Sequence, residues 1–291
     1  MDDKVKILIC CHKKTNTCND NIYLPIQVGH AVSANELDMQ KDDQVLGKAC
    51  DNISRLNGIY CEMTAMYWAW KNIRKIYPDL KYVGLCHYRR YFYVKNKSIG
   101  NLIRFESQKI KTLIKVLSNR PCKTTIFDPI YHISDVEEKA LTGSNSLLSS
   151  AIKGFDVIAT EPCKLININV EDFFKVIGRD YIDLLTEIVE KNYPQFKDYY
   201  HDVLAGNRLY AANMLILKIE LLDEYCSFVF GVLEKHIELS KKKGLCYDPE
   251  NEKCYGRVSG YLAEILTCTY LFYCRDRLCF KTLDKCFIEN V

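Results

Sequence analysis

The chain has 291 residues, of which 48% are hydrophobic and 26% charged. This length predicts one large domain or two closely joined ones with an extended core, and we favour a single domain over 1–291. The composition excludes collagen, coiled-coil and largely disordered chains. Lys and Arg number 40 and Asp and Glu 37, so the formal net charge is only +3. Duplex-binding proteins carry a clear basic excess, so a nucleic-acid partner is not expected.

The 15 cysteines form an odd set, spread from Cys10 to Cys286. No signal peptide is expected, because the N-terminus carries an apolar run of only about five residues. Unpaired thiols without a leader favour a cytoplasmic protein, and no run of about 18 uncharged apolar residues could span a membrane. Metal binding by Cys10, Cys11, His12 and Cys18 is disfavoured, because adjacent residues of a strand point to opposite faces.

In the first third of the chain we expect two buried strands separated by a helix. Residues 5–11 (VKILICC) are an apolar run too short for a helix, which predicts a strand that ends at His12. From Asn57, apolar and aromatic residues recur at helical spacing until Pro78 stops the helix. Residues 80–94 open as a second strand and become polar at His87.

The rest of the chain continues this alternation. We expect strands at 155–160 and 212–218 and helices at 180–192, 221–239 and 257–273. Residues 95–150 form a variable, insertion-like region with a basic amphipathic piece at 108–118, and residues 240–291 form a C-terminal helical region. The pattern predicts an α/β sheet covered on both sides, which binds ligands at the carboxyl ends of its strands. No P-loop and no GxGxxG motif occurs.

The strongest local signal is LCHYRRYF at 85–92, where Arg89 and Arg90 follow a buried strand among aromatic residues. A guanidinium group offers a planar fork of donors that matches phosphate oxygens, and two together could neutralise a diphosphate without a metal. The alternative is that both arginines end the strand and pair with surface carboxylates. The aromatic neighbours favour a pocket.

A second signal is DNISRLNGIYCEMTAMYWAWKN at 51–72. Asp51 and Asn52 precede the helix, where short polar side chains could read a base or ribose hydroxyls. Glu62 lies in the first turns of the helix, where a carboxylate also complements the helix dipole without any further role. By their spacing, Tyr67, Trp68 and Trp70 are expected to be core residues rather than a stacking platform for a ligand.

Several motifs of the sequence together resemble those of one family. They are HYRRY after a strand, YCE.TA.YWAWKN before it, KILICCHKK at the start, and NMLILK…DEYC and RVSGYLAE downstream. The family they resemble is a bacterial capsular and exopolysaccharide family, formerly a domain of unknown function and then assigned as galactofuranosyltransferases. The resemblance is dense over the first 92 residues and sparser over 155–271. It implies a GT-A-like nucleotide-sugar-binding fold with a mixed central sheet flanked by helices. It also implies transfer of galactofuranose from UDP-galactofuranose, with inversion, to a lipid-linked capsular, O-antigen or exopolysaccharide intermediate.

The resemblance also implies a set of substrate-binding residues. The segment His87–Arg90 stands where GT-A enzymes usually carry a metal-binding DXD motif, so we expect metal-independent or weakly metal-dependent transfer, with no metal site and no cofactor. Gly256 and Ile265 depart from the family pattern, which expects Gln and Arg there. The expected substrate-binding residues are His12, Lys13, Asp51, Asn52, Asn57, His87, Tyr88, Arg89, Arg90, Asn213 and Arg257.

Inverting transfer needs one carboxylate to deprotonate the acceptor hydroxyl, and a departing nucleoside diphosphate needs no second acid. Glu264, Asp202 and Glu62 are the favoured candidates, although Glu264 could equally form a buried ion pair with Arg257. Asp156, Asp223 and Glu224 are further candidates, and the last two are better explained as partners of a helix dipole.

The implied partners are a UDP-sugar donor and a glycan acceptor on polyprenyl diphosphate at the inner face of the membrane. Lys241–Lys243 and residues 269–287 mix basic and aromatic groups, which would suit a peripheral membrane contact. A core-facing C-terminal helix with a solvated basic edge explains them equally well. Two functional alternatives stay open: a UDP-hexopyranose-dependent transferase of the same fold, and a non-catalytic nucleotide-sugar-binding module of a polysaccharide assembly complex.

Overall fold

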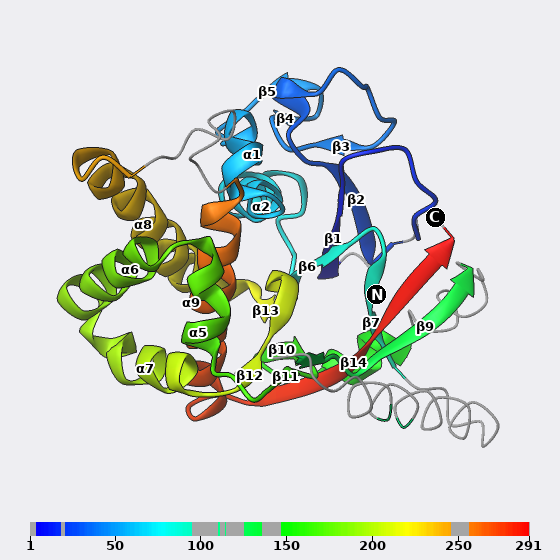
Figure 1. The fold of residues 1–291 in the computed structure, drawn as a ribbon. Coiled ribbons are helices and arrows are strands. Elements are labelled where there is room, and N and C mark those ends of the chain that lie inside the picture. The colour runs from blue at the N-terminus through cyan, green and yellow to red at the C-terminus, as the bar shows by residue number, and fades with distance from the viewer. Residues whose placement is uncertain are drawn as a thin grey trace.

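The computed structural model describes residues 4–18, 21–94, 125–135, 147–245 and 256–290, together with Ile110 and Ile114. The predicted amphipathic piece at 108–118 and most of the insertion-like region 95–150 lie outside these residues. Figure 1 shows a central sheet, with α5–α9 gathered on one side of the molecule and β1 and β2 on the other.

The described residues form a nine-stranded mixed sheet. β1, β2 and β6 run parallel, β13 is antiparallel to β6, and β10 is antiparallel to β13. β14 is long enough to pair with β10 through its first half and with β7 and β9 through its second. The strands are β1 (Val5–Cys11), β2 (Tyr23–Gln27), β3 (Gln40–Lys41), β6 (Tyr82–His87), β7 (Arg90–Tyr93), β9 (Ile130–Asp135), β10 (Val157–Thr160), β13 (Leu215–Lys218) and β14 (Phe280–Asn290).

Two small sheets and a set of α-helices complete the described fold. β4 (Gln44–Val45) pairs with β5 (Lys48–Ala49), and β11 (Cys163–Ile166) pairs with β8 (Thr125–Phe127) and β12 (Arg208–Leu209). The helices are α1 (Asn57–Tyr60), α2 (Met63–Ile76), α5 (Val170–Phe174), α6 (Arg179–Asn192), α7 (Lys197–Ala205), α8 (Leu222–Lys242) and α9 (Val258–Arg275).

The sheet separates two hydrophobic cores. Leu8 and Cys10 of β1 pack with the helices, whereas Ile7, Ile9 and Cys11 pack in the second core on the opposite face. This division follows from the alternation of side chains along a strand, as expected for the adjacent cysteines Cys10 and Cys11. The described cysteines form no disulfide with one another. Trp68 is fully buried, as its helical spacing predicted.

The predicted strands and helices are confirmed, with ends that shift by a few residues, except at two places. The helix expected from Asn57 is split at Cys61 and Glu62 into α1 and α2, because Cys61 adopts a positive φ of 53°. The expected C-terminal helical region is wrong beyond Arg275, because Phe280–Asn290 is the strand β14. Its pairing with three distant strands, rather than its local pattern, determines this conformation. Residues 269–287 therefore do not form one amphipathic helix: they belong partly to the buried helix α9 and partly to the sheet.

The basic triplet Lys241–Lys243 is exposed at the end of α8. Lys242 pairs with Glu238 at 2.5 Å, and Lys243 pairs with Glu187 at 3.0 Å. Both pairs are on the surface, where such contacts contribute little to stability. No helix in the described ranges combines the length and the apolar character needed to cross a membrane.

Candidate functional site

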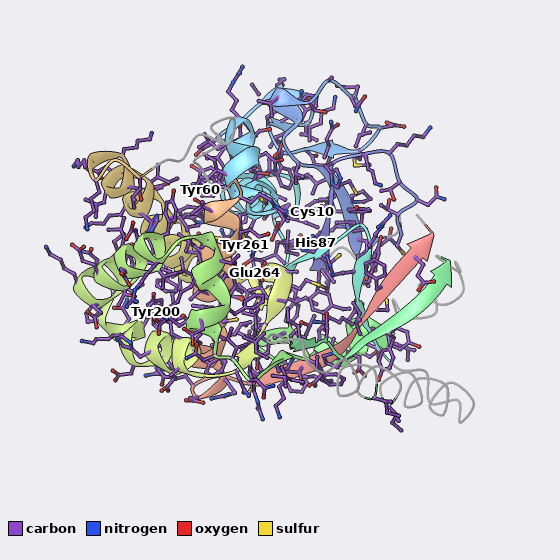
Figure 2. All side chains as sticks on the ribbon, in the orientation of Figure 1. Cys10, Tyr60, His87, Tyr200, Tyr261 and Glu264 are labelled. Atoms are coloured by element: carbon purple, nitrogen blue, oxygen red, sulfur yellow. The ribbon has the colours of Figure 1, made fainter. Side chains whose placement is uncertain are left out.

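A cavity of about 660 Å³ opens where β1 and β6 end, which is the edge of the sheet that the strand pattern predicted for a ligand. Its size is typical of a site for a small molecule or cofactor. Figure 2 shows Cys10, His87, Tyr261 and Glu264 together near the centre of the molecule, with Tyr200 apart among the helices. The predicted residues that line it are His12, Asn57, Glu62, His87, Tyr88, Arg90, Arg257 and Glu264.

The ends of β1 and β6 are joined by a short network. The backbone N–H of Tyr88 donates to the carbonyl of Cys10 at 3.3 Å, and the rings of His12 and Tyr88 meet edge to face at 5.2 Å. His87 Nε2 donates to the carbonyl of Ala212 at 2.8 Å, which fixes the imidazole and its tautomer. Ala212 and the next residue both adopt positive φ, so this turn is locally strained.

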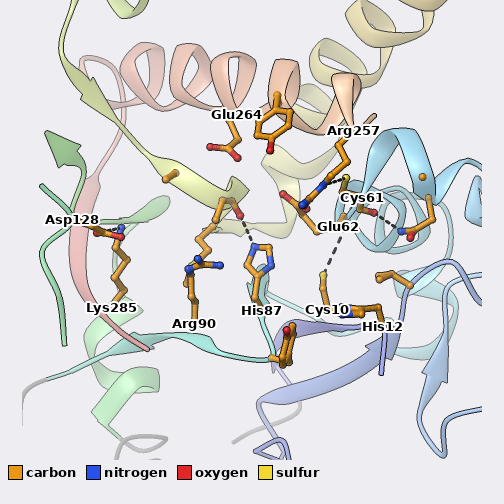
Figure 3. Close-up of a pocket in the computed structure, with 18 residues that line it drawn as sticks. Cys10, His12, Cys61, Glu62, His87, Arg90, Asp128, Arg257, Glu264 and Lys285 are labelled. Carbon is orange, nitrogen blue, oxygen red and sulfur yellow. Dashed lines mark hydrogen bonds and ion pairs between the residues drawn. The ribbon is translucent and has the colours of Figure 1, made fainter. Parts of the chain in front are cut away.

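The opposite wall is the start of α9. Arg257, Tyr261 and Glu264 are four and three residues apart, so they share one face of the helix. Arg257 lies in the left-handed region at φ 68°, and its Nε donates to Cys61 Sγ at 3.1 Å. Figure 3 shows its guanidinium group beside Cys61 and Glu62.

Glu62 is held by a buried chain of hydrogen bonds. Tyr225 and Thr267 are joined at 2.9 Å, and Thr267 Oγ1 donates to Asn213 Oδ1 at 2.8 Å. Asn213 Nδ2 in turn donates to Glu62 Oε1 at 2.9 Å. Asn213 is fully buried and its amide is engaged in these bonds, so the structure gives it a positioning role behind the cavity wall.

We expect Asn213→Leu to lower the free energy of unfolding by about 1–3 kcal/mol, because the buried Glu62 carboxyl and Thr267 hydroxyl each lose a partner. Leucine also tolerates the positive φ at this position less well than asparagine. Urea denaturation measures the change. Asn192→Leu, at an exposed helix position, is the matched control and should change stability little. Equal stability of the two variants would contradict the role of the network.

Among the carboxylates that line the cavity, Glu264 has surroundings that shift its pKa. Burial, and after it the nearby Glu62 carboxylate, raise the pKa of Glu264 to about 7. The N–H of Ala212 and the guanidinium groups of Arg90 and Arg257 oppose this rise. Burial lowers the pKa of His12, and the neighbouring charges of Lys13, Arg257 and Arg89 lower it too. The cavity therefore holds a carboxyl group that changes its charge near neutral pH.

The structure places six of the predicted residues outside the cavity lining: Asn213, which lies behind the wall, and Lys13, Arg89, Asp51, Asn52 and Asp202. Lys13 lies over the Tyr88 ring at 5.5 Å, and Arg89 lies between the Tyr88 and Phe287 rings at 5.4 and 5.9 Å. Only Arg90 of the two arginines lines the cavity, because Arg89 is in the turn between β6 and β7 and Arg90 begins β7. The two arginines that line the cavity are therefore not the adjacent Arg89 and Arg90 but Arg90 and Arg257, which come from distant elements.

The other three residues have local roles. Asp51 accepts from the hydroxyl of Tyr67 at 3.2 Å. Asn52 bonds the carbonyl of Cys50 at 2.7 Å and the N–H of Ser54 at 3.0 Å, as in an Asx turn. Asp202 is exposed on α7, away from the cavity, so it does not serve as a base there.

Sequence reasoning missed several lining residues, chiefly Cys61, Asp128, Tyr261 and Lys285. Tyr261 could have been found, because it shares a helix face with Arg257 and Glu264. Asp128 and Lys285 had no local signal, since they are far apart in the sequence and meet only through the pairing of β9 with β14. Over the residues that the structure describes, no group of three or more His, Cys, Asp or Glu is arranged to hold a metal ion.

Residues 6–274 match a family described as Domain of unknown function (DUF4422). The chain belongs to this family. The DUF4422 match covers the cavity residues from β1 to α9, and it confirms the expected membership of a family first catalogued without a function. No curated protein matches the chain.

One solved structure, the bifunctional glycosyltransferase WbbM in its apo form, is similar to the DUF4422 chain at 25% sequence identity and a TM-score of 0.73. The match covers 99% of this chain and 46% of WbbM, so the chain spans less than half of that protein. The likeness confirms the predicted GT-A-like fold with its mixed central sheet flanked by helices.

Proposed function

We propose that this chain is a glycosyltransferase that transfers galactofuranose from UDP-galactofuranose, with inversion, to a lipid-linked polysaccharide intermediate. The similarity to WbbM supports glycosyl transfer in general. The proposal is carried by one observation. The cavity at the carboxyl ends of β1 and β6 contains two arginines, Arg90 and Arg257, together with Glu264, whose pKa is about 7. The donor sugar and the acceptor rest on the family resemblance of the sequence motifs.

Arg90 and Arg257 would bind the diphosphate of the donor. Each guanidinium group offers paired donors to phosphate oxygens, and both lie close enough to Glu264 to lower its pKa. Fixed positive charge stabilises the leaving nucleoside diphosphate as the bond to the sugar breaks. His12 lies at the end of the cavity opposite Asp128 and Lys285 (Figure 3), and Asn57 lines the cavity from α1; the nucleoside would fit there. Because arginine supplies the charge, transfer should persist in the presence of EDTA.

Glu264 would be the general base. The acceptor hydroxyl attacks the anomeric carbon, its proton passes to the Glu264 carboxylate, and the bond between the sugar and the diphosphate oxygen breaks with release of UDP. A base works best when its pKa lies near the working pH, as that of Glu264 does at about 7. Glu62 is a weaker candidate, because the amide of Asn213 already occupies one of its oxygens.

Turnover with paired donors tests the proposal. The protein is incubated with UDP-galactofuranose or UDP-galactopyranose and a lipid-linked glycan acceptor, and UDP release and the anomeric configuration of the product are measured. We expect transfer from the furanose donor, with inversion. Transfer from the pyranose donor alone would instead identify a hexopyranosyltransferase. Binding of UDP without turnover of either donor would overturn catalysis in favour of a nucleotide-sugar-binding module.

The pH dependence of transfer follows from the raised pKa of Glu264. A base must be deprotonated to act, so kcat/KM should rise about tenfold per pH unit below about 7 and become constant above it. The same shift destabilises the fold as pH increases, because the pKa in the folded state exceeds the unfolded value near 4.5. Stability from this group should therefore be greatest below pH 4.5 and decline up to about pH 7. A flat activity profile between pH 5.5 and 8 would contradict the assignment of Glu264 as the base.

A further inference from the structure

A buried ion pair forms the end of the cavity opposite His12. Lys285 lies on β14, and Asp128 lies in the connection between β8 and β9. Lys285 Nζ is 2.6 Å from Asp128 Oδ1, and the exposed fractions of the two side chains are 2% and 32%. Both residues line the cavity. In Figure 3 they lie at one end of it and Arg257 lies toward the other, with Arg90 and Glu264 in between.

Among the described residues, Asp128 is the carboxylate that lies within ion-pair distance of Lys285. Its Nζ also donates to Cys163 Sγ at 3.4 Å, but burial raises the pKa of Cys163 to about 12, so that thiol is neutral. Removing an ammonium group from water is unfavourable, and an apolar pair of the same size is often as stable as a buried ion pair. Stability of the fold therefore does not explain why this pair lies on the cavity wall.

The chemistry of the pair indicates its ligand. A fixed ammonium group beside a fixed carboxylate presents a donor and an acceptor with no net charge, which matches two neighbouring hydroxyl groups. A phosphate would be repelled by Asp128, and an ammonium group by Lys285. We propose that Asp128 and Lys285 form a subsite for the hydroxyl groups of a neutral sugar ring. This inference rests on the proposed glycosyl transfer and adds the residues that bind the hydroxyl groups of a sugar.

The position of the subsite is consistent with an inverting reaction. Attack with inversion requires the nucleophile to approach from the side opposite the leaving group, so the nucleotide and the acceptor must extend in opposite directions from the reacting carbon. Glu264 lies between the Asp128–Lys285 pair and Arg257 in Figure 3. The ring bound by the pair is therefore the transferred sugar or the ring of the acceptor, and the same experiment distinguishes the two.

The double variant Asp128→Asn/Lys285→Met tests the subsite, because it removes both charges and preserves side-chain volume. The control is Asp156→Asn/Lys218→Met, which removes a pair at 2.5 Å that is not part of the cavity lining. UDP affinity is measured by calorimetry, the KM for UDP-galactofuranose by its hydrolysis, and the KM for the lipid-linked acceptor by transfer. Lost hydrogen bonds to charged groups should raise one KM about 10–100-fold, with UDP affinity within about twofold of wild type.

Each outcome of this experiment decides the proposal. A rise in the donor KM assigns the transferred sugar to the pair, and a rise in the acceptor KM assigns the acceptor ring. If neither KM changes in the folded double variant, the subsite is overturned. If the double variant fails to fold, Asp128→Asn alone is measured in the same way. If the wild type binds UDP-galactofuranose without turnover, the proposed function fails, and the subsite is then judged by calorimetry with UDP-galactofuranose against UDP and with methyl galactofuranoside.

Discussion

Replacing Glu264 with glutamine should reduce the rate of transfer by about 10²–10⁴-fold, the usual contribution of a general base. Glutamine keeps the shape of the side chain but cannot accept the proton of the acceptor hydroxyl. UDP affinity should stay equal or increase, because a negative group near Arg90 and Arg257 is lost. Transfer is measured as UDP release in the presence of acceptor, and UDP affinity by calorimetry.

Two controls separate a lost base from a damaged fold. Asp202→Asn changes an exposed carboxylate on α7 and should leave transfer unchanged. Glu264→Gln should melt at the same temperature as the wild type or higher at pH 8, since it removes a carboxylate that burial disfavours in its charged form. A near-normal rate for Glu264→Gln, together with a large loss for Glu62→Gln, would transfer the role of base to Glu62.

Replacing Arg90 with alanine should lower the transfer rate by about 10²–10³-fold and weaken the binding of UDP. Uridine has no diphosphate, so its affinity should be almost unaffected, and calorimetry with UDP and uridine isolates the loss of the phosphate contact. Arg89→Ala is the neighbouring control. Arg89 packs against aromatic rings outside the cavity lining, so its loss should change UDP affinity by no more than about threefold.

The comparison of these two variants tests the clamp directly. Equal losses of UDP affinity in Arg89→Ala and Arg90→Ala would show that both arginines reach the diphosphate, as the sequence motif alone suggests. Unchanged UDP affinity in Arg90→Ala would remove Arg90 from the donor site. Arg90→Lys, which keeps the charge but not the fork of donors, should recover part of the lost affinity.

Much of the candidate site could be predicted because parallel strands end at the same edge of a sheet. The expected strands at 5–11 and 80–94 already placed His12 and His87 near each other. Helical spacing likewise placed Arg257 and Glu264 near each other, on one face of the predicted helix. Local sequence could not decide between Arg89 and Arg90, because the choice depends on where the turn ends and β7 begins. The local role of Asn52 could have been predicted, because an asparagine side chain often accepts from the backbone N–H two residues later, here that of Ser54, in an Asx turn.

The remaining errors come from contacts between distant parts of the sequence. The segment 280–290 has no clear strand pattern, and its conformation is set by pairing with β10, β7 and β9. Missing that strand also meant missing Lys285 and its partner Asp128. Periodicity reports which face of an element is buried, but it carries no information about which elements become neighbours.

β14 follows every other described strand in the sequence, yet it lies between β10 and β7 inside the sheet. During synthesis on the ribosome, β7 and β10 are made long before the strand that joins them. Until residues 280–290 have left the exit tunnel, the edges of β7 and β10 that pair with β14 stay open, and Lys285 is absent from the cavity wall. Assembly of this sheet therefore waits until β14 has been synthesised, and a nascent chain halted before β14 would expose strand edges that favour aggregation.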